Sequence, residues 1–330
     1  MFVDLLTRDN LHLSRVTMDA LTGLLGHKIN STADLPRPVA DYVRDSLAEN
    51  TRRAYLSDLA HFEDWGGQIP ATPELIAYYL AAHAETLSVA TLVRRIASLS
   101  KAHEALGVAN PTRSALVKAT MRGIRRARGT AQKEAKPLLK DDLVIVLQSM
   151  CDSLKDARDK ALLLIGFAGG FRRSELVGID WGDVEHVRQG IVVNIRRSKT
   201  DQTGMGRKIG IPFGRTHWCP VAALDEWLAR SGIVEGAVFR PVDRHSKTTG
   251  SRLSGEAVSL VVKERVAAAG IDPENFSGHS LRSGLATSAA QAGVSSWKIR
   301  QQTGHASDAM LGRYIRDGEL FTDNAAGALL

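Results

Sequence analysis

The sequence predicts a mainly α-helical protein with a small β-sheet, in which an all-helical first half precedes an α+β second half. Three observations lead to this fold class. Apolar residues recur at helical spacing through most of the first 130 residues. A basic, polar segment that ends at Pro137 then separates the two halves. Beyond it, two segments suited to strands lie among further helical segments.

The most regular helix of the first half is expected to begin after Ser88, whose hydroxyl can cap it. One face of this helix is apolar and comprises Val89, Leu92, Val93, Ile96, Leu99 and Leu106. Its other surface carries Arg94, Arg95, Ser98 and Lys101, a pattern that a solvated polar face would also give. An earlier segment, 51–62, has an apolar stripe of Tyr55, Leu59 and Phe62 and carries Arg52 and Arg53 at its start.

Charge becomes lopsided between residues 113 and 136. The cations there include Arg122, Arg125, Arg126 and Arg128, and Glu134 is the one acid among them. The end of this stretch is polar, contains glycine and stops at Pro137, which is typical of a linker. A basic linker between two domains is well placed to lie along a phosphate backbone.

Helices and one hairpin are expected after Pro137. Helices are predicted over 143–150 and 157–168, the second ending at a glycine pair. Two strands, 190–197 and 207–213, flank a polar turn that contains Lys199, which is typical of a β-hairpin. Further helices are predicted over 220–230, 254–269, 281–292, 296–304 and 307–314.

Composition and charge set outer limits on the class of protein. The 330 residues suffice for two domains, and 44% hydrophobic with 24% charged residues is typical of a globular protein. A net charge of +7 is compatible with a polyanionic partner. The two cysteines, Cys151 and Cys219, argue against a disulfide scaffold and suit a reducing cytoplasm. We find neither a membrane span nor a signal peptide, and therefore expect a cytoplasmic protein.

Five local features occur in order in the second half: Gly170-Phe-Arg172 with Glu175 nearby, Lys199 in the hairpin turn, His279-Ser-Leu-Arg282, Gly304-His305, and Tyr314. Taken singly, each is a weak signal. Together and in this order they resemble the catalytic domain of the tyrosine recombinases, the family of Cre recombinase and the phage integrases. The resemblance covers about residues 138–316 and includes Arg313-Tyr-Ile-Arg316 around the tyrosine.

The resemblance implies a phosphoryl-transfer site without metal, ATP or another cofactor. Arg172 and Arg282 would hold the phosphate, because guanidinium groups are planar, permanently charged and bidentate. The sequence shows no carboxylate cluster suited to Mg²⁺. Glu175 would orient neighbouring Arg or His side chains, or serve in a helix cap or in packing.

Tyr314 would be the nucleophile. A phenol with a pKa near 10 is only about 0.1% ionised at pH 7, which corresponds to roughly 4 kcal/mol, so it needs a proton acceptor. His279 is the candidate acceptor, and His305 would donate a hydrogen bond to a phosphate oxygen. Lys199 would protonate the departing 5′-oxygen. The product would be a 3′-phosphotyrosyl bond, and exchange with a partner duplex would proceed through a Holliday junction.

The same resemblance implies an organisation and partners. It gives an N-terminal extension (1–34), a helical core DNA-binding domain (35–128), a basic linker (129–137), the catalytic domain (138–316) and a C-terminal tail (317–330). The partner would be double-stranded DNA with an inverted-repeat recombination site, bound by a homotetramer on two DNA sites. The phosphate contacts would come from the basic residues Arg52, Arg53, Arg94, Arg95, Lys101, Arg122, Arg125, Arg126 and Arg128. The apolar tail would dock in a neighbouring protomer or be a frayed end.

Three alternatives have different predictions. A type IB topoisomerase uses the same chemistry, and only a dependence on paired specific sites separates it from a recombinase. A non-catalytic DNA-binding relative would lack one of the six residues, and none is lacking. A nuclease or other hydrolase would need a water-activating group or a metal site, which we do not find in the sequence.

Overall fold

The computed structural model describes residues 42, 48–130, 135–196, 206–305, 307, 311–314 and 329. The chain divides into two compact units, Met1–Lys133 and Glu134–Leu330. This division falls inside the segment predicted as a linker. None of the helices in the described part of the chain combines the length and the apolarity needed to cross a lipid bilayer.

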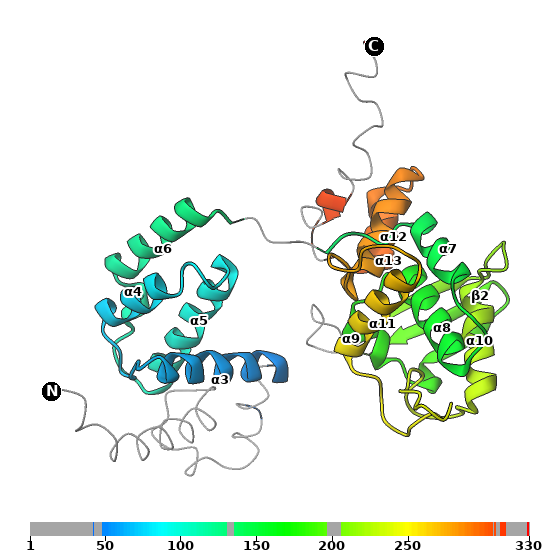
Figure 1. Cartoon of the computed structure of the whole chain (residues 1–330), viewed down its shortest axis with the longest axis horizontal. Coiled ribbons are helices and arrows are strands. Elements are labelled where there is room, and N and C mark those ends of the chain that lie inside the picture. The colour runs from blue at the N-terminus through cyan, green and yellow to red at the C-terminus, as the bar shows by residue number, and fades with distance from the viewer. Residues whose placement is uncertain are drawn as a thin grey trace. The chain divides into compact units, whose positions relative to one another are not determined.

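The described part of the first unit is helical, as predicted. It contains α3 (Glu49–Asp64), α4 (Pro73–Ala82), α5 (Val89–Ala105), a short 3-10 helix (Pro111–Arg113) and α6 (Ala115–Arg128) (Figure 1). Ser88 caps α5 as predicted, and Thr72 and Ser114 cap α4 and α6 in the same way. The unit's core is apolar and includes Leu59, Phe62, Tyr79, Leu80, Leu92 and Leu99.

The buried face of α5 differs from the prediction in detail. Leu92 and Leu99 are buried as expected, but Val93 is 40% exposed. Arg95 and Ser98, which were placed on the other surface of the helix, are buried. The reason is a buried carboxylate on a neighbouring helix. Polar side chains of α5 are buried because they contact this carboxylate inside the unit.

The second unit combines helices with a three-stranded antiparallel sheet. Its elements are α7 (Lys140–Gln148), α8 (Leu154–Gly169), α9 (Arg173–Gly178), a 3-10 helix (Trp181–Asp183), β1 (Val184–Val187), β2 (Gly190–Ile195), β3 (Arg207–Pro212), α10 (Pro220–Ser231), α11 (Gly255–Ala268), α12 (His279–Gln291) and α13 (Ser296–Thr303). Residues 311–314 form a further helical segment. The predicted hairpin is confirmed as β2–β3, whereas β1 and α9 were not predicted.

The core of this unit surrounds α8, against which α10 and α12 pack (Figure 1). Every residue from Ala161 to Ile165 on this helix is buried. In the sheet, Val193 pairs with Ile209 and Ile191 with Ile211, and these side chains belong to the same core. Alternation along each strand then sends Lys208 and Gly210 to the exposed side.

Candidate active site

Arg172 begins a short helix and is held by an acid one turn further on. The preceding helix, α8, ends at Gly170, whose φ of 57° is a left-handed conformation that favours glycine. Glu175 is buried and accepts hydrogen bonds from the backbone N of Arg172 at 3.0 Å and from its Nη1 at 2.6 Å. Glu175 thus combines two roles that the sequence left open, the helix cap and the orientation of an arginine.

His279 and Arg282 lie three residues apart on α12, and therefore on one face of it. His279 is exposed at the start of the helix, whereas Arg282 is only 1% exposed. Nη1 of Arg282 donates to the carbonyl oxygens of Gly170, at 2.8 Å, and Thr303. Burial, and secondly the charge of Arg172, lower the pKa of Arg282 to about 10, so the group stays charged at neutral pH.

Three arginines from separate elements converge on the last carbonyls of α13. The bonds run from Arg207 Nη1 to Gln302 O at 3.1 Å, from Arg282 Nη1 to Thr303 O, and from Arg172 Nη2 to Gly304 O at 3.2 Å. The last carbonyls of a helix have no partner within the helix and carry its negative dipole end. The end of α13 therefore holds three positive groups in one place, although their mutual repulsion opposes this.

His305 follows directly and is buried among these cations. Its Nδ1 lies 2.7 Å from Oγ1 of Thr303, and its backbone oxygen accepts from Nε of Arg300 at 3.1 Å. Burial lowers the pKa of His305 to about 3, and Arg282 and Arg172 act in the same direction. The imidazole is therefore neutral at physiological pH.

Tyr314 contacts both histidines. Its Oη lies 2.8 Å from Nε2 of His279, and its ring centroid lies 5.8 Å from that of His305. Leu311, one turn before it, is fully buried in a small apolar cluster that includes Ala286 and Ile299. Packing of Leu311 against these residues of α12 and α13 fixes the distance between the tyrosine and the histidines.

Arg207 belongs to this site and was not singled out from the sequence. It is the first residue of β3, and its Nη2 donates to Glu175 at 3.0 Å, so that Glu175 joins Arg207 to Arg172. The alternation of inward and outward side chains along β3 could have indicated that Arg207 points inward. Arg207 shares a face with the buried Ile209 and Ile211, and a cation on the inward face of a strand requires a partner inside.

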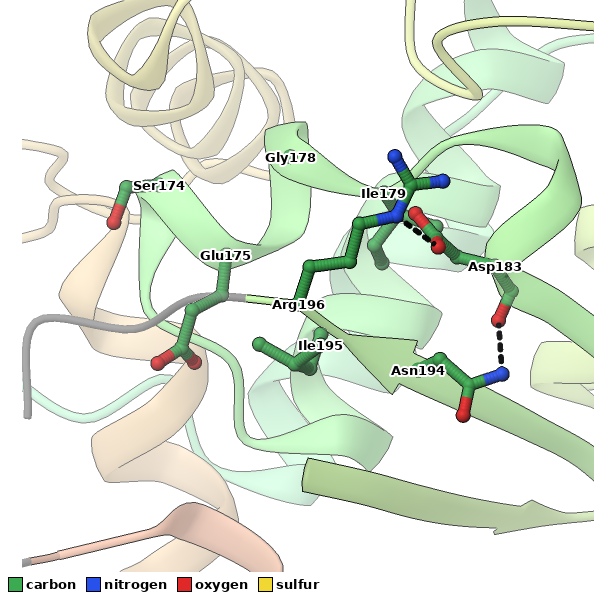
Figure 2. A pocket seen from close by; sticks show the side chains of 8 residues that line it. All are labelled: Ser174, Glu175, Gly178, Ile179, Asp183, Asn194, Ile195 and Arg196. Atoms are coloured by element: carbon green, nitrogen blue, oxygen red, sulfur yellow. Dashed lines mark hydrogen bonds and ion pairs between the residues drawn. The ribbon is translucent and has the colours of Figure 1, made fainter. Parts of the chain in front are cut away.

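Lys199 lies outside the described residues, as does the rest of segment 197–205. The end of β2 that leads to this segment borders a cavity of about 480 Å³ (Figure 2). The cavity is lined by Ser174, Glu175, Gly178, Ile179, Asp183, Asn194, Ile195 and Arg196. Arg196 is turned to Asp183, with Nε 2.7 Å from Oδ1, and Glu175 connects the cavity to the arginines.

The nine basic residues expected to contact DNA have different environments in the first unit. Exposed residues of this set are Arg53, Arg94, Lys101, Arg122, Arg125, Arg126 and Arg128. Some of them have acidic neighbours: Lys101 pairs with Glu104, and Arg128 with Glu85. Arg52, which is partly buried, pairs with Glu49.

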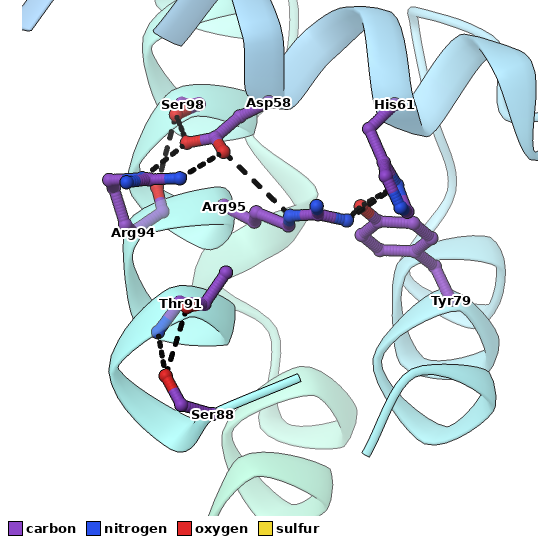
Figure 3. Close-up of polar contacts among 8 residues, drawn as sticks. All are labelled: Asp58, His61, Tyr79, Ser88, Thr91, Arg94, Arg95 and Ser98. Carbon is purple, nitrogen blue, oxygen red and sulfur yellow. Dashed lines mark hydrogen bonds and ion pairs between the residues drawn. The ribbon is translucent and has the colours of Figure 1, made fainter. Parts of the chain in front are cut away.

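Arg95 is the exception because it is buried in a polar network between α3, α4 and α5 (Figure 3). Asp58, on α3, is 3% exposed and accepts from Arg94 Nη2 at 2.8 Å and Ser98 Oγ at 2.8 Å. Arg95 lies 3.7 Å from the same carboxylate and donates to Oη of Tyr79. Within this network Arg95 has an internal role, whereas Arg94 keeps an exposed edge.

Comparison with known proteins places these residues in context. The sequence model described as the phage integrase family matches residues 136–319. An "Integrase/recombinase xerD homolog" from Selenomonas ruminantium is 40% identical over 290 residues, covering 85% of this chain and 85% of that protein.

Two solved structures have a similar fold. A XerH site-specific recombinase, bound to a palindromic difH substrate in a post-cleavage complex, gives a TM-score of 0.61 at 16% identity and covers 96% of this chain and 94% of that one. A lambda integrase tetramer bound to a Holliday junction gives a TM-score of 0.60 at 17% identity and covers 92% and 78%.

Proposed function

Because this chain belongs to the phage integrase family and is a site-specific DNA recombinase of the tyrosine type, we propose that it acts through a covalent bond between Tyr314 and a DNA phosphate. The observation that carries the proposal is the 2.8 Å contact between Oη of Tyr314 and Nε2 of His279, next to the buried guanidinium of Arg282. A hydroxyl, a base and a fixed positive charge are the parts that phosphoryl transfer to a side chain needs.

In the first step His279 takes the phenolic proton as Oη attacks phosphorus. At pH 7, ionising a phenol with a pKa near 10 costs roughly 4 kcal/mol. Proton transfer to His279 during the attack lowers this cost. The new O–P bond joins Tyr314 to the 3′ side of the DNA, and the bond from phosphorus to the 5′-oxygen breaks. Lys199 supplies the proton that makes the leaving oxygen a hydroxyl.

Arg172 and Arg282 neutralise the charge that spreads over the non-bridging oxygens. Both carbonyl contacts of Arg282 involve Nη1. They orient the whole guanidinium group, and neither of them uses Nε or Nη2. Glu175 and the end of α13 fix Arg172 before substrate arrives, so little reorganisation is needed during the reaction. The two guanidinium groups supply the positive charge that a metal ion supplies in other phosphoryl-transfer sites. No ATP is needed, because the phosphotyrosyl bond retains the energy for rejoining.

The second half of the reaction reverses these roles. A 5′-hydroxyl from a partner duplex attacks phosphorus and gives its proton to Lys199. The bond from phosphorus to Oη of Tyr314 breaks, and His279 returns its proton to Tyr314. Four protomers on two inverted-repeat sites would perform two such exchanges, with a Holliday junction between them. The exposed basic residues of α3, α5 and α6 would hold the DNA backbone, and the C-terminal tail would dock in a neighbouring protomer.

The test is adduct formation on a nicked substrate, from which the short 5′-hydroxyl strand diffuses away. The substrate would be an inverted repeat selected from random DNA by binding. Wild type should form a denaturation-resistant adduct equally well in Mg²⁺ and in excess EDTA, and Tyr314→Phe should bind the DNA without forming it. Tyr78→Phe, at a tyrosine that is 67% exposed, is the matched control.

Adduct formation by Tyr314→Phe would exclude this nucleophile. Relaxation of supercoiled plasmids that lack the selected site would favour a type IB topoisomerase instead, because a recombinase requires paired specific sites.

A further inference from the structure

Thr303, the last residue of α13, contacts two residues of the site through different atoms. Its backbone oxygen accepts from Arg282, and its Oγ1 lies 2.7 Å from Nδ1 of His305. The side chain is fully buried, and its Cγ2 methyl lies against Gly170, where an added Cβ would approach it to 2.9 Å. A residue in this place affects both the arginine and the histidine.

The hydrogen of the Thr303 hydroxyl is already used. Oγ1 lies 2.7 Å from the carbonyl oxygen of Ile299, one turn earlier on the same helix. A carbonyl oxygen can only accept, so the single hydroxyl hydrogen points to Ile299. Oγ1 can then only accept from His305, and the hydrogen between them belongs to Nδ1.

The surroundings of His305 keep the ring neutral. The groups that face it or adjoin it are Arg172, Arg207, Arg282, His279, Tyr314 and Arg300. Four of these are arginines, and the charges of Arg172, Arg207 and Arg282 oppose a further proton. A neutral imidazole carries one hydrogen on its two nitrogens. With that hydrogen on Nδ1, the other nitrogen, Nε2, has a lone pair and can only accept.

We propose that Thr303 is a positioning residue that holds neutral His305 in the tautomer with hydrogen on Nδ1, so that Nε2 donates to phosphate only after His305 takes up a proton. The proposal rests on the proposed function in one respect, the binding of a DNA phosphate at this site. The phosphate charge offsets Arg172 and Arg282 and so raises the proton affinity of His305. The proton comes from solvent, goes to Nε2, and turns it into a donor for a non-bridging oxygen.

The tautomer can be measured without DNA. In full-length protein labelled with ¹⁵N-histidine, long-range ¹H–¹⁵N spectra distinguish a protonated nitrogen from one with a lone pair, and loss of signals in His305→Gln assigns the residue. We expect hydrogen on Nδ1 in wild type and in Thr303→Ser, which keeps the hydroxyl. Thr303→Val keeps the shape and the Cγ2 contact but offers Nδ1 no acceptor, so hydrogen should move to Nε2.

A wild-type ring with hydrogen on Nε2 overturns the proposal, even if Thr303→Val does not fold. So does a Thr303→Val spectrum identical to wild type.

The consequence for catalysis is a difference in pH dependence. Wild-type adduct formation needs protonated His305 and should weaken as the pH rises above the pKa of His305 in the DNA complex. Thr303→Val can donate from neutral Nε2, so the ratio of its rate to the wild-type rate should rise, by up to about tenfold per pH unit in that range. Contributions of His279, Tyr314 and Lys199 cancel in this ratio.

Thr303→Ser should give a ratio that does not change with pH. A ratio for Thr303→Val that is likewise flat overturns the proton-uptake step. Failure of the proposed function would instead appear as an adduct that still forms in Tyr314→Phe. That outcome would not change the tautomer measured in the spectra of the free wild-type protein.

Discussion

Replacement of Glu175 by Gln should both destabilise the second unit and slow DNA cleavage. The carboxylate side chain is 1% exposed and binds Arg172 and Arg207, whose side chains are 17% and 21% exposed. Removing one partner of a buried ion pair typically costs 3–5 kcal/mol, and the partial exposure of the two arginines argues for the lower end. We therefore expect a loss of about 3 kcal/mol in the free energy of unfolding.

For a domain of roughly 200 residues this loss corresponds to a decrease of about 6–12 °C in the midpoint of thermal unfolding. The measurement is calorimetry of the full chain, in which the unit Glu134–Leu330 carries the change. Adduct formation should fall on the order of 100-fold or more, since Arg172 loses its orienting partner. Glu185→Gln, at an exposed position of β1, is the matched control and should change stability by less than about 0.5 kcal/mol.

The reasoning about Glu175 is refuted if its Gln variant unfolds within about 1 °C of wild type and cleaves DNA at the wild-type rate. A stability loss without a change in cleavage would leave the cap role of Glu175 and remove its role in orienting Arg172.

Three further results are expected. Lys199→Ala should be severely defective on an ordinary phosphodiester but much less so on a substrate with sulfur at the 5′ bridging position, because a thiolate leaves without a proton; equal defects would mean that Lys199 does not protonate the leaving group. Gly304→Ala should lower the free energy of unfolding by about 1–2 kcal/mol because of its φ of 65°. The loss should exceed that of Gly270→Ala, which has a φ of 77° and open space, because the new Cβ at 304 would lie 2.5 Å from Nη1 of Arg207. Equal losses in chemical denaturation would show that Arg207 moves aside at no cost. Deletion of 324–330 should impair recombination more than binding to a half-site, and normal recombination with normal cooperativity in gel shifts would make the tail a frayed end.

The elements that sequence predicted well are those with local signals. Ser88 and the apolar spacing after it predicted α5, and Gly170 predicted the end of α8. The strand β1 was missed because Val184-Glu-His-Val187 lacks the alternation of a half-buried strand. Its pairing with β2 is a tertiary effect that no local pattern reports.

The same distinction applies to the candidate site. The order of the motif residues predicted a set of side chains, and among the described residues the structure brings Arg172, His279, Arg282, His305 and Tyr314 together, whereas Lys199 lies outside them.

What sequence did not predict depends on long-range partners. Arg95 is buried because Asp58 lies on another helix, and Arg207 belongs to the site because Glu175 and the end of α13 meet it there. A charged residue alone does not indicate whether such a partner exists. Thr303 was overlooked for the same reason, since its hydroxyl matters only through the ring two residues later.

The most direct test of the central claim is to identify the amino acid that becomes linked to DNA. The adduct formed by wild type on the nicked substrate would be digested with nuclease and trypsin and sequenced by mass spectrometry. We expect a nucleotide on the tyrosine of Tyr314-Ile-Arg316, attached through its 3′-phosphate, and a free 5′-hydroxyl on the released strand. A nucleotide on any of the other four tyrosines, or a 5′-phosphate linkage, would contradict the assignment of this site.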